Sequence, residues 1–178
     1  MDDAEMKTVI ATQARDIIAT RRFDAPRALV WRAWTDPQMM AAWWGPETYT
    51  ATATMDVREG GAFCLTMHSP DGGDYPIPGT FGEIIENETL VMIMRIDNQP
   101  EDWHAHLKAV HAGLGGIPEQ YSRDPIVMRV TFSGDNPTTV TVRQTFTNTL
   151  MRDVHIGLGS GIGWNSSFNK LDAILAQA

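Results

Sequence analysis

Glu83 is the residue in this sequence with the clearest potential for proton chemistry. It alternates with Phe81 and Ile85 along a predicted strand, which places a carboxylate on an otherwise apolar face. A polar group buried without a partner costs about 1–3 kcal/mol, so Glu83 is expected to pair or to orient a ligand. The alternative is a structural ion pair near the strand end with Arg95 or Arg143. In an apolar cavity this carboxyl group would suit general acid or base catalysis, which makes Glu83 one catalytic candidate.

The five histidines offer side chains that titrate near neutral pH. His104 and His106 form an H-x-H and His111 follows, but no cysteine or fixed carboxylate spacing completes a metal site. We therefore expect no metal, and we interpret these three histidines as solvated residues or as part of a lid. His68 borders a loop and His155 precedes a glycine-rich run, so either could act as an acid or a base. His68 is the second catalytic candidate.

The glycine-rich run Gly157–Gly163 precedes a predicted helix, as a nucleotide-binding loop would. A G-x-G-x-x-G motif would need glycine at Ile162 or Trp164, and no strand follows to complete a βαβ unit. No P-loop lysine follows, and no Ser-His-Asp or Cys-His nucleophile has a recognisable spacing. We therefore expect no nucleotide and no other cofactor. The glycines are interpreted as letting the helix start pass close to the sheet.

Five methionines on predicted strands favour an internal cavity. Methionine fills irregular apolar space and adapts to different contacts, as a lined pocket requires, although an ordinary core uses it too. Gln144 adds one polar group to the apolar face that Val142 and Phe146 share. The methionines are Met55, Met67, Met92, Met94 and Met128.

Four of the six tryptophans fall in one short stretch that also carries helix signals. Asp24 and Asp36 each stand close before a proline suited to the first turn of a helix, which predicts helices over residues 26–35 and 37–43. The Trp43-Trp44 pair, at the end of the second helix, fits either a cavity wall or the core.

The strands that must position these residues have a period of two and are separated by turn signals. Successive hairpins predict an antiparallel sheet with one wet side. Trp164, Phe168, Leu171 and Leu175 form one apolar stripe, so a C-terminal helix ending near Ala176 is expected to pack on that sheet. Residues 1–14 show no firm period and are expected to be a tail or a short helix. The predicted strands cover residues 16–23, 49–57, 62–68, 79–86, 89–96, 126–133 and 138–147.

The segment from Asp97 to Pro125 is too long for a passive link between two strands. Its residues 101–114 could form a helix that ends at the following glycines. Trp103 and Leu107 are four apart and would share one face of that helix. We interpret the segment as a lid with both side chains turned inward; the alternative is a contact in a homodimer.

Length and charge limit the class of protein. A chain of 178 residues is expected to form one domain, here residues 15–178. The net charge of −8 argues against a nucleic-acid surface. No apolar run is long enough for a membrane span, and the N-terminus lacks the apolar region of a signal peptide. The single cysteine, Cys64, excludes an internal disulfide and fits a cytoplasmic protein.

Several spaced motifs resemble the START-like, helix-grip (SRPBCC) superfamily, and within it the family named after the activator of heat-shock protein 90 ATPase. The resemblance implies an α+β fold like that of the birch-pollen allergen: a curved antiparallel sheet of about seven strands around a long C-terminal helix. The superfamily includes co-chaperone domains, cyclases and lipid carriers, so the resemblance leaves the function open. The motifs are Phe23-Asp24-Ala25-Pro26, Val30–Pro37, Trp43–Pro46, Arg58–Phe63, Gly79–Ile84 and Gly163-Trp164.

We therefore expect a cavity of about 300–1,000 Å³ between sheet and helix that binds a small hydrophobic or aromatic molecule. The first alternative is a cyclase- or hydrolase-like enzyme that uses the same cavity. The second is a co-chaperone that regulates a chaperone ATPase. The residues expected to line the cavity are Trp43, Met67, Phe81, Glu83, Met92, Met94, Met128, Gln144, Trp164 and Phe168.

Overall fold

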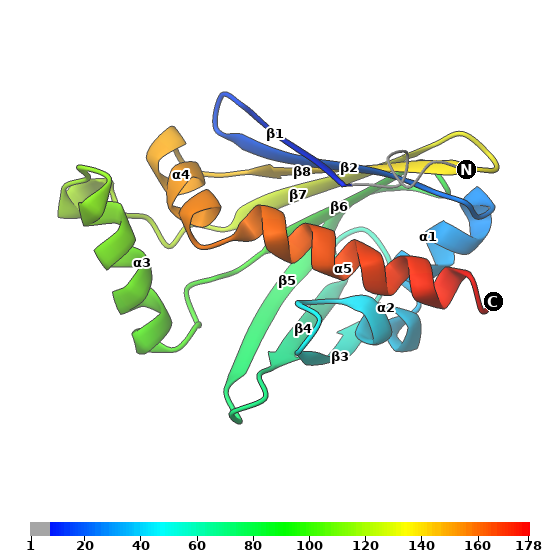
Figure 1. The fold of residues 1–178 in the computed structure, drawn as a ribbon, viewed down its shortest axis with the longest axis horizontal. Coiled ribbons are helices and arrows are strands. Elements are labelled where there is room, and N and C mark those ends of the chain that lie inside the picture. Colours follow the sequence, from blue (N-terminus) through cyan, green and yellow to red (C-terminus); the bar gives the residue numbers. More distant parts are fainter. Residues whose placement is uncertain (1–7) are drawn as a thin grey trace.

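The computed structural model describes residues 8–178, which form one antiparallel sheet with helices on one side of it (Figure 1). The strands are β1 (Val9–Gln13), β2 (Asp16–Phe23), β3 (Thr50–Met55), β4 (Ala62–His68), β5 (Asp74–Ile85), β6 (Thr89–Met94), β7 (Ile126–Ser133) and β8 (Thr138–Thr145). The helices are α1 (Arg27–Thr35), α2 (Pro37–Trp43), α3 (Glu101–Gly113), α4 (Thr149–Gly157) and α5 (Ser160–Leu175), with a 3-10 turn at Pro118–Gln120.

The sheet has the strand order β1-β2-β8-β7-β6-β5-β4-β3. From β3 to β8 each strand pairs with the next one in the chain, as the turn signals predict. β2 instead pairs with β8 over its whole length, from Asp16 opposite Thr145 to Phe23 opposite Thr138. The two helices that follow β2 carry the chain across to β3 at the other edge of the sheet.

α5 lies across the sheet, with α1 and α2 beside its C-terminal half (Figure 1). Its predicted apolar stripe is buried: Phe168 and Leu171 are fully inaccessible, and Trp164 and Leu175 are each 7% exposed. Arg21 of β2 forms an ion pair with Asp172 and donates to Asn169, which fixes the helix to the sheet. The α+β helix-grip architecture is therefore confirmed. No helix among residues 8–178 is long and apolar enough to cross a membrane.

The tryptophan-rich stretch forms the packed corner that its composition indicates. Asp36 caps α2 by accepting from the backbone nitrogen of Met39, as predicted. Asp24 does not cap α1, since the cap position is Pro26 and no side chain closes it. Trp43 is fully buried against Trp34, with ring centroids 4.6 Å apart, and its Nε1 donates to the carbonyl of Ala33.

The expectation for the N-terminal region was wrong for residues 9–13, which form strand β1 rather than a tail or helix. This strand makes the sheet eight-stranded instead of about seven. β1 pairs with a neighbour only on one side, and Val9 is 62% exposed, so the strand lacks the alternation that a half-buried strand would show. Residues 1–7 lie outside the described residues.

Glu83 does not face the apolar side of the sheet as predicted, because β5 contains a bulge. The register with β6 shifts between Phe81 and Ile84, so that both of these residues face the core although they are three positions apart. The extra residue turns the Glu83 side chain to the outer face, where it pairs with Arg129 at 2.8 Å. The predicted ion-pair partners are engaged elsewhere: Arg95 with Asp97, and Arg143 with Asp16.

The inserted segment contains the expected helix as α3, which lies beside α4 at one end of the sheet (Figure 1). Leu107 is fully buried and Trp103 is half-buried, so both turn inward as the helical spacing predicts. His104 and His111 are also buried, against the ring of Tyr121, and are not solvated. His106 is exposed on the opposite side of the helix.

Candidate functional site

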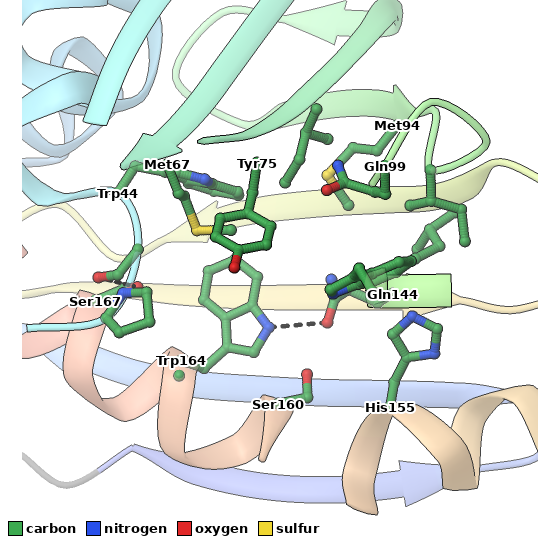
Figure 2. Close-up of a pocket in the computed structure, with 17 residues that line it drawn as sticks. Trp44, Met67, Tyr75, Met94, Gln99, Gln144, His155, Ser160, Trp164 and Ser167 are labelled. Carbon is green, nitrogen blue, oxygen red and sulfur yellow. Dashed lines mark hydrogen bonds between the residues drawn. The ribbon is translucent and has the colours of Figure 1, made fainter. Parts of the chain in front are cut away.

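A pocket of about 250 Å³ lies between the sheet, the N-terminal half of α5 and the inserted segment (Figure 2). Its size is slightly below the expected range. The loop after α2 forms one wall, β4 to β8 supply the floor, and Trp103 of α3 and His155 of α4 close the opposite end. The lining residues are Trp44, Gly45, Pro46, Met67, Tyr75, Ile77, Met94, Ile96, Gln99, Trp103, Ile126, Gln144, His155, Ser160, Gly163, Trp164 and Ser167.

Apolar and aromatic side chains make up most of the lining. Trp44 and Trp164 meet edge to face, with ring centroids 5.8 Å apart. Met67 and Met94 approach from neighbouring regions of the sheet (Figure 2). Indole rings give rigid apolar surface, and thioethers adapt to different shapes, so the walls suit an apolar guest.

Gln144 is the polar group at the centre of the pocket floor. Its Oε1 accepts a hydrogen bond of 2.9 Å from Nε1 of Trp164 (Figure 2). This bond sets the orientation of the amide, because the oxygen must face the indole and the NH2 group must face away. The side chain is only 9% exposed, and its nitrogen makes no hydrogen bond within residues 8–178. Two donors therefore face the pocket without a protein partner.

His155 reaches the pocket from α4. Its Nδ1 donates to the carbonyl of Met151 at 2.9 Å, which leaves Nε2 as the acceptor nitrogen. That Nε2 is buried without a partner within residues 8–178, and the ring packs against Phe146 and Trp103. Burial lowers the pKa of His155 below its usual value, so the imidazole is neutral at neutral pH.

The wall after α2 is fixed by an unusual set of contacts. Gly45 adopts a left-handed conformation with φ 91°, and a Cβ atom there would lie 3.1 Å from the sulfur of Met67. Ser167 donates to the carbonyl of Gly45 at 3.1 Å. The ammonium group of Lys170 lies 3.2–3.4 Å from four backbone carbonyls of residues 44–49. α5 therefore positions the wall of the pocket that follows α2.

Two residues of the inserted segment, Gln99 and Trp103, contact other parts of the protein at the pocket. The amide nitrogen of Gln99 donates to the carbonyl of Pro76 on β5. Trp103 contacts His155 edge to face, with ring centroids 6.3 Å apart. These contacts place the segment over one end of the pocket, where a lid would lie. Its role as a lid, and the alternative of a dimer contact, stay predictions.

Four of the residues expected to line the cavity do so: Met67, Met94, Gln144 and Trp164. Five others belong to the closed core instead, because they lie deeper between the sheet and α5, where neighbouring side chains leave no space. They are Trp43, Phe81, Met92, Met128 and Phe168, none more than 2% exposed.

The two catalytic candidates both lie outside the pocket. Glu83 is on the outer face of the sheet for the reason given above. His68 is also on the outer face: its Nδ1 contacts Asp74 at 2.7 Å and its Nε2 contacts Thr52 at 3.1 Å. This network joins β3, β4 and β5 on the wet side of the sheet. Within residues 8–178 no three His, Cys, Asp or Glu side chains converge as metal ligands would.

Several of the lining residues were not predicted from the sequence, because the ends of helices and strands decide whether these residues face the pocket. Trp44 rather than Trp43 faces the pocket, because the helix ends at Trp43 and the next residue turns outward into the wall. Tyr75 enters because β5 begins at Asp74, earlier than predicted. His155 enters because Gly159, with φ 87°, breaks the C-terminal region into two helices. Only the glycines around residue 159 gave a signal of that break.

Fold and pocket together define an α+β helix-grip protein with one side of its sheet hollowed beside the long helix. The family model "Activator of Hsp90 ATPase homolog 1-like protein" matches residues 24–176, and the chain belongs to this family. The resemblance drawn from the motifs is thereby confirmed. Among curated proteins there is no match.

Solved structures from several bacteria are similar over nearly the whole chain. A protein from Rhodobacter sphaeroides has a TM-score of 0.78 at 15% identity, covering 97% of this chain and 99% of that one. A protein from Mycobacterium smegmatis has a TM-score of 0.75 at 21% identity, covering 96% and 98%. One from Arthrobacter aurescens has a TM-score of 0.74 at 22% identity, covering 96% and 92%. At such identities the likeness shows the fold alone.

Proposed function

We propose that this protein binds one small, largely apolar molecule in the pocket between the sheet, α5 and α3. The observation that carries the proposal is the lining, in which tryptophan, methionine and isoleucine side chains surround a small number of polar groups. A concave, largely apolar pocket with a few placed donors and acceptors is the usual form of a small-molecule site. An empty pocket lowers stability, because larger side chains could fill the same space. A pocket that is kept open is therefore expected to bind a ligand.

Gly163 offers a direct test, because it lines the pocket from the interior of α5. A Cβ atom added there meets no heavy atom within 4 Å. Gly163→Leu should fill the pocket and weaken the binding of an environment-sensitive apolar dye by about tenfold or more. The same change should not lower the melting temperature, since glycine costs a helix interior about 1 kcal/mol relative to alanine.

Gly163→Ala is the matched control, because it brings the same gain in helix propensity but leaves most of the volume free. Dye fluorescence and thermal melts measure the two effects, and native mass spectrometry of protein from its own host would show a carried molecule. Equal dye affinity of the wild type, Gly163→Ala and Gly163→Leu would refute the proposal.

A cyclase- or hydrolase-like enzyme in the same pocket is a second candidate, and His155 is the observation that favours it. Its Nδ1 is held by the Met151 carbonyl, so Nε2 is the nitrogen that could take a proton. Glu83 no longer supports this candidate, because it lies on the outer face. Substrate turnover that is lost in His155→Gln, with unchanged dye binding, would establish catalysis.

The description of the family names activation of the Hsp90 ATPase, which would make a chaperone the partner. That role needs an outer surface and not the pocket. An Hsp90 ATPase assay with wild type and Gly163→Leu separates the two functions. Equal stimulation by both proteins would indicate a chaperone role that is independent of the ligand.

A further inference from the structure

The pocket lining offers several hydrogen-bond donors: the amide of Gln144, Nε1 of Trp44, which is buried without a partner within residues 8–178, and the hydroxyl groups of Tyr75 and Ser160. Of these, the amide of Gln144 is the donor whose direction a protein hydrogen bond fixes. Because Trp164 holds the oxygen of this amide at 2.9 Å, the group cannot turn over to present its acceptor without leaving an indole N–H unpaired. The NH2 group therefore has a fixed direction, and it has no partner within residues 8–178. A donor on the wall of an apolar pocket is satisfied when a guest presents an acceptor, such as a carbonyl oxygen.

The charge of the pocket excludes an anionic acceptor. No lysine, arginine, aspartate or glutamate of the described chain lines it. The ammonium group of Lys170, which is not part of the lining, is directed to the carbonyls of residues 44–49. His155 is neutral for the reason given above. A carboxylate would lose its hydration without gaining a counter-charge, which is costly in an apolar site.

The volume limits the guest to a small ring system. A dry cavity of about 150 Å³ lined by apolar side chains holds benzene. At about 250 Å³ this partly open pocket has room for a second ring or a short substituent as well. The indole rings of Trp44 and Trp164 favour an aromatic surface on the guest.

Resting on the proposed function, we infer that the pocket selects a neutral, two-ring aromatic molecule with a hydrogen-bond acceptor, which the amide NH2 of Gln144 binds. Gln144 is then the residue that determines specificity, and Trp164 is the positioning residue that orients its amide.

Three naphthalene derivatives of nearly equal shape test the inference by isothermal titration calorimetry at pH 7.5. These are 2-acetylnaphthalene, which carries a carbonyl, 2-ethylnaphthalene, which lacks it, and 2-naphthoate, which carries a charge. We expect the ketone to bind about three- to tenfold more tightly than the hydrocarbon, as one neutral hydrogen bond provides. We expect the carboxylate to bind at least about tenfold more weakly than the ketone.

The role of Gln144 is tested in the Trp164→Phe variant, which lacks the indole N–H. Trp164→Phe keeps the Gln144 amide, whereas the double variant Gln144→Met/Trp164→Phe removes it and leaves no unpaired indole N–H. The preference for ketone over hydrocarbon should weaken in Trp164→Phe, where the amide can turn over, and fall to about one in the double variant. Thermal melts of both variants establish that they fold, and the three wild-type affinities test the inference even if a variant does not.

The titrations distinguish failure of the inference about Gln144 from failure of the proposed ligand-binding function. If none of the three probes binds, the proposed function fails. If the hydrocarbon binds as tightly as the ketone, or if the preference survives without Gln144, the pocket binds apolar molecules but the role of Gln144 is overturned. Tighter binding of 2-naphthoate would overturn the neutral character of the guest.

Discussion

At the scale of single residues, Lys170 links the buried helix to the pocket wall. Its ammonium group lies beside four backbone carbonyls of residues 44–49. Two of these have a further donor, since Gly45 accepts from Ser167 and Pro46 accepts from the backbone nitrogen of Tyr49. Burial lowers the pKa of Lys170, while Glu47 opposes this shift.

Lys170→Met should lower the free energy of unfolding by about 1–3 kcal/mol, because it leaves partly buried carbonyls without donors. The wall formed by Trp44, Gly45 and Pro46 should also become less ordered, so dye affinity should fall. Chemical denaturation and dye titration measure both effects. The control is Lys108→Met on α3, where the lysine is exposed. Equal stability of Lys170→Met and Lys108→Met would contradict this structural role.

At the scale of elements, the inserted segment is held to the fold by α3 and by contacts between aromatic rings. The Nδ1 of His104 lies 2.8 Å from the hydroxyl of Tyr121, and His111 packs edge to face on the same ring. Arg123 pairs with Glu101 at the edge of this cluster. Burial, with a smaller contribution from Arg123, lowers the pKa of His104 below the ordinary value of 6.5. The segment is therefore docked through a neutral histidine.

The stability of the docked segment should decrease in acid. The folded-state pKa of His104 is below its unfolded value, so below about pH 6.5 the unfolded chain binds more protons than the folded one. The contribution is complete above that pH and is lost as the pH falls toward the folded-state pKa, at up to about 1.4 kcal/mol per pH unit. His155, whose pKa is also lowered by burial, adds to the same slope.

Melting temperatures between pH 7.5 and 5.0 measure this slope. His104→Gln should reduce it, because glutamine can still bond to Tyr121 but does not titrate. His106→Gln is the matched control on the exposed side of the same helix. An unchanged pH dependence in His104→Gln would show that this histidine does not couple protons to folding.

At the scale of the whole molecule, stability depends on how the sheet holds α5. Leu171 is fully buried at the middle of the stripe, where truncation leaves a cavity that the rigid sheet cannot close. Leu171→Ala should therefore cost about 2–5 kcal/mol in urea or thermal unfolding. Ile162→Ala on the same helix, where the side chain is 79% exposed, should be nearly neutral. A melt of Leu171→Ala that matches that of Ile162→Ala would contradict this packing.

The sequence by itself determined strands β2 to β8, helices α1, α2, α3 and α5, and their order along the chain, but not β1 or α4. The period-two strands, the Asp36 cap and the stripe from Trp164 to Leu175 each depend on residues a few positions apart, so they could be recognised locally. β1 was not predicted, because an exposed edge strand lacks the alternation of apolar and polar residues that a buried face produces.

Only the tertiary structure decided which residues meet in the pocket. A bulge in β5 places Glu83 on the outer face of the sheet instead of in the pocket. Because α2 ends at Trp43, Trp44 lines the pocket in place of the predicted Trp43. His155 entered because the chain breaks at Gly159 into the two helices α4 and α5. The physical reason is that a cavity is the space left after all elements have packed. A shift of one residue in a strand or a turn changes its lining without changing the pattern that predicts the fold.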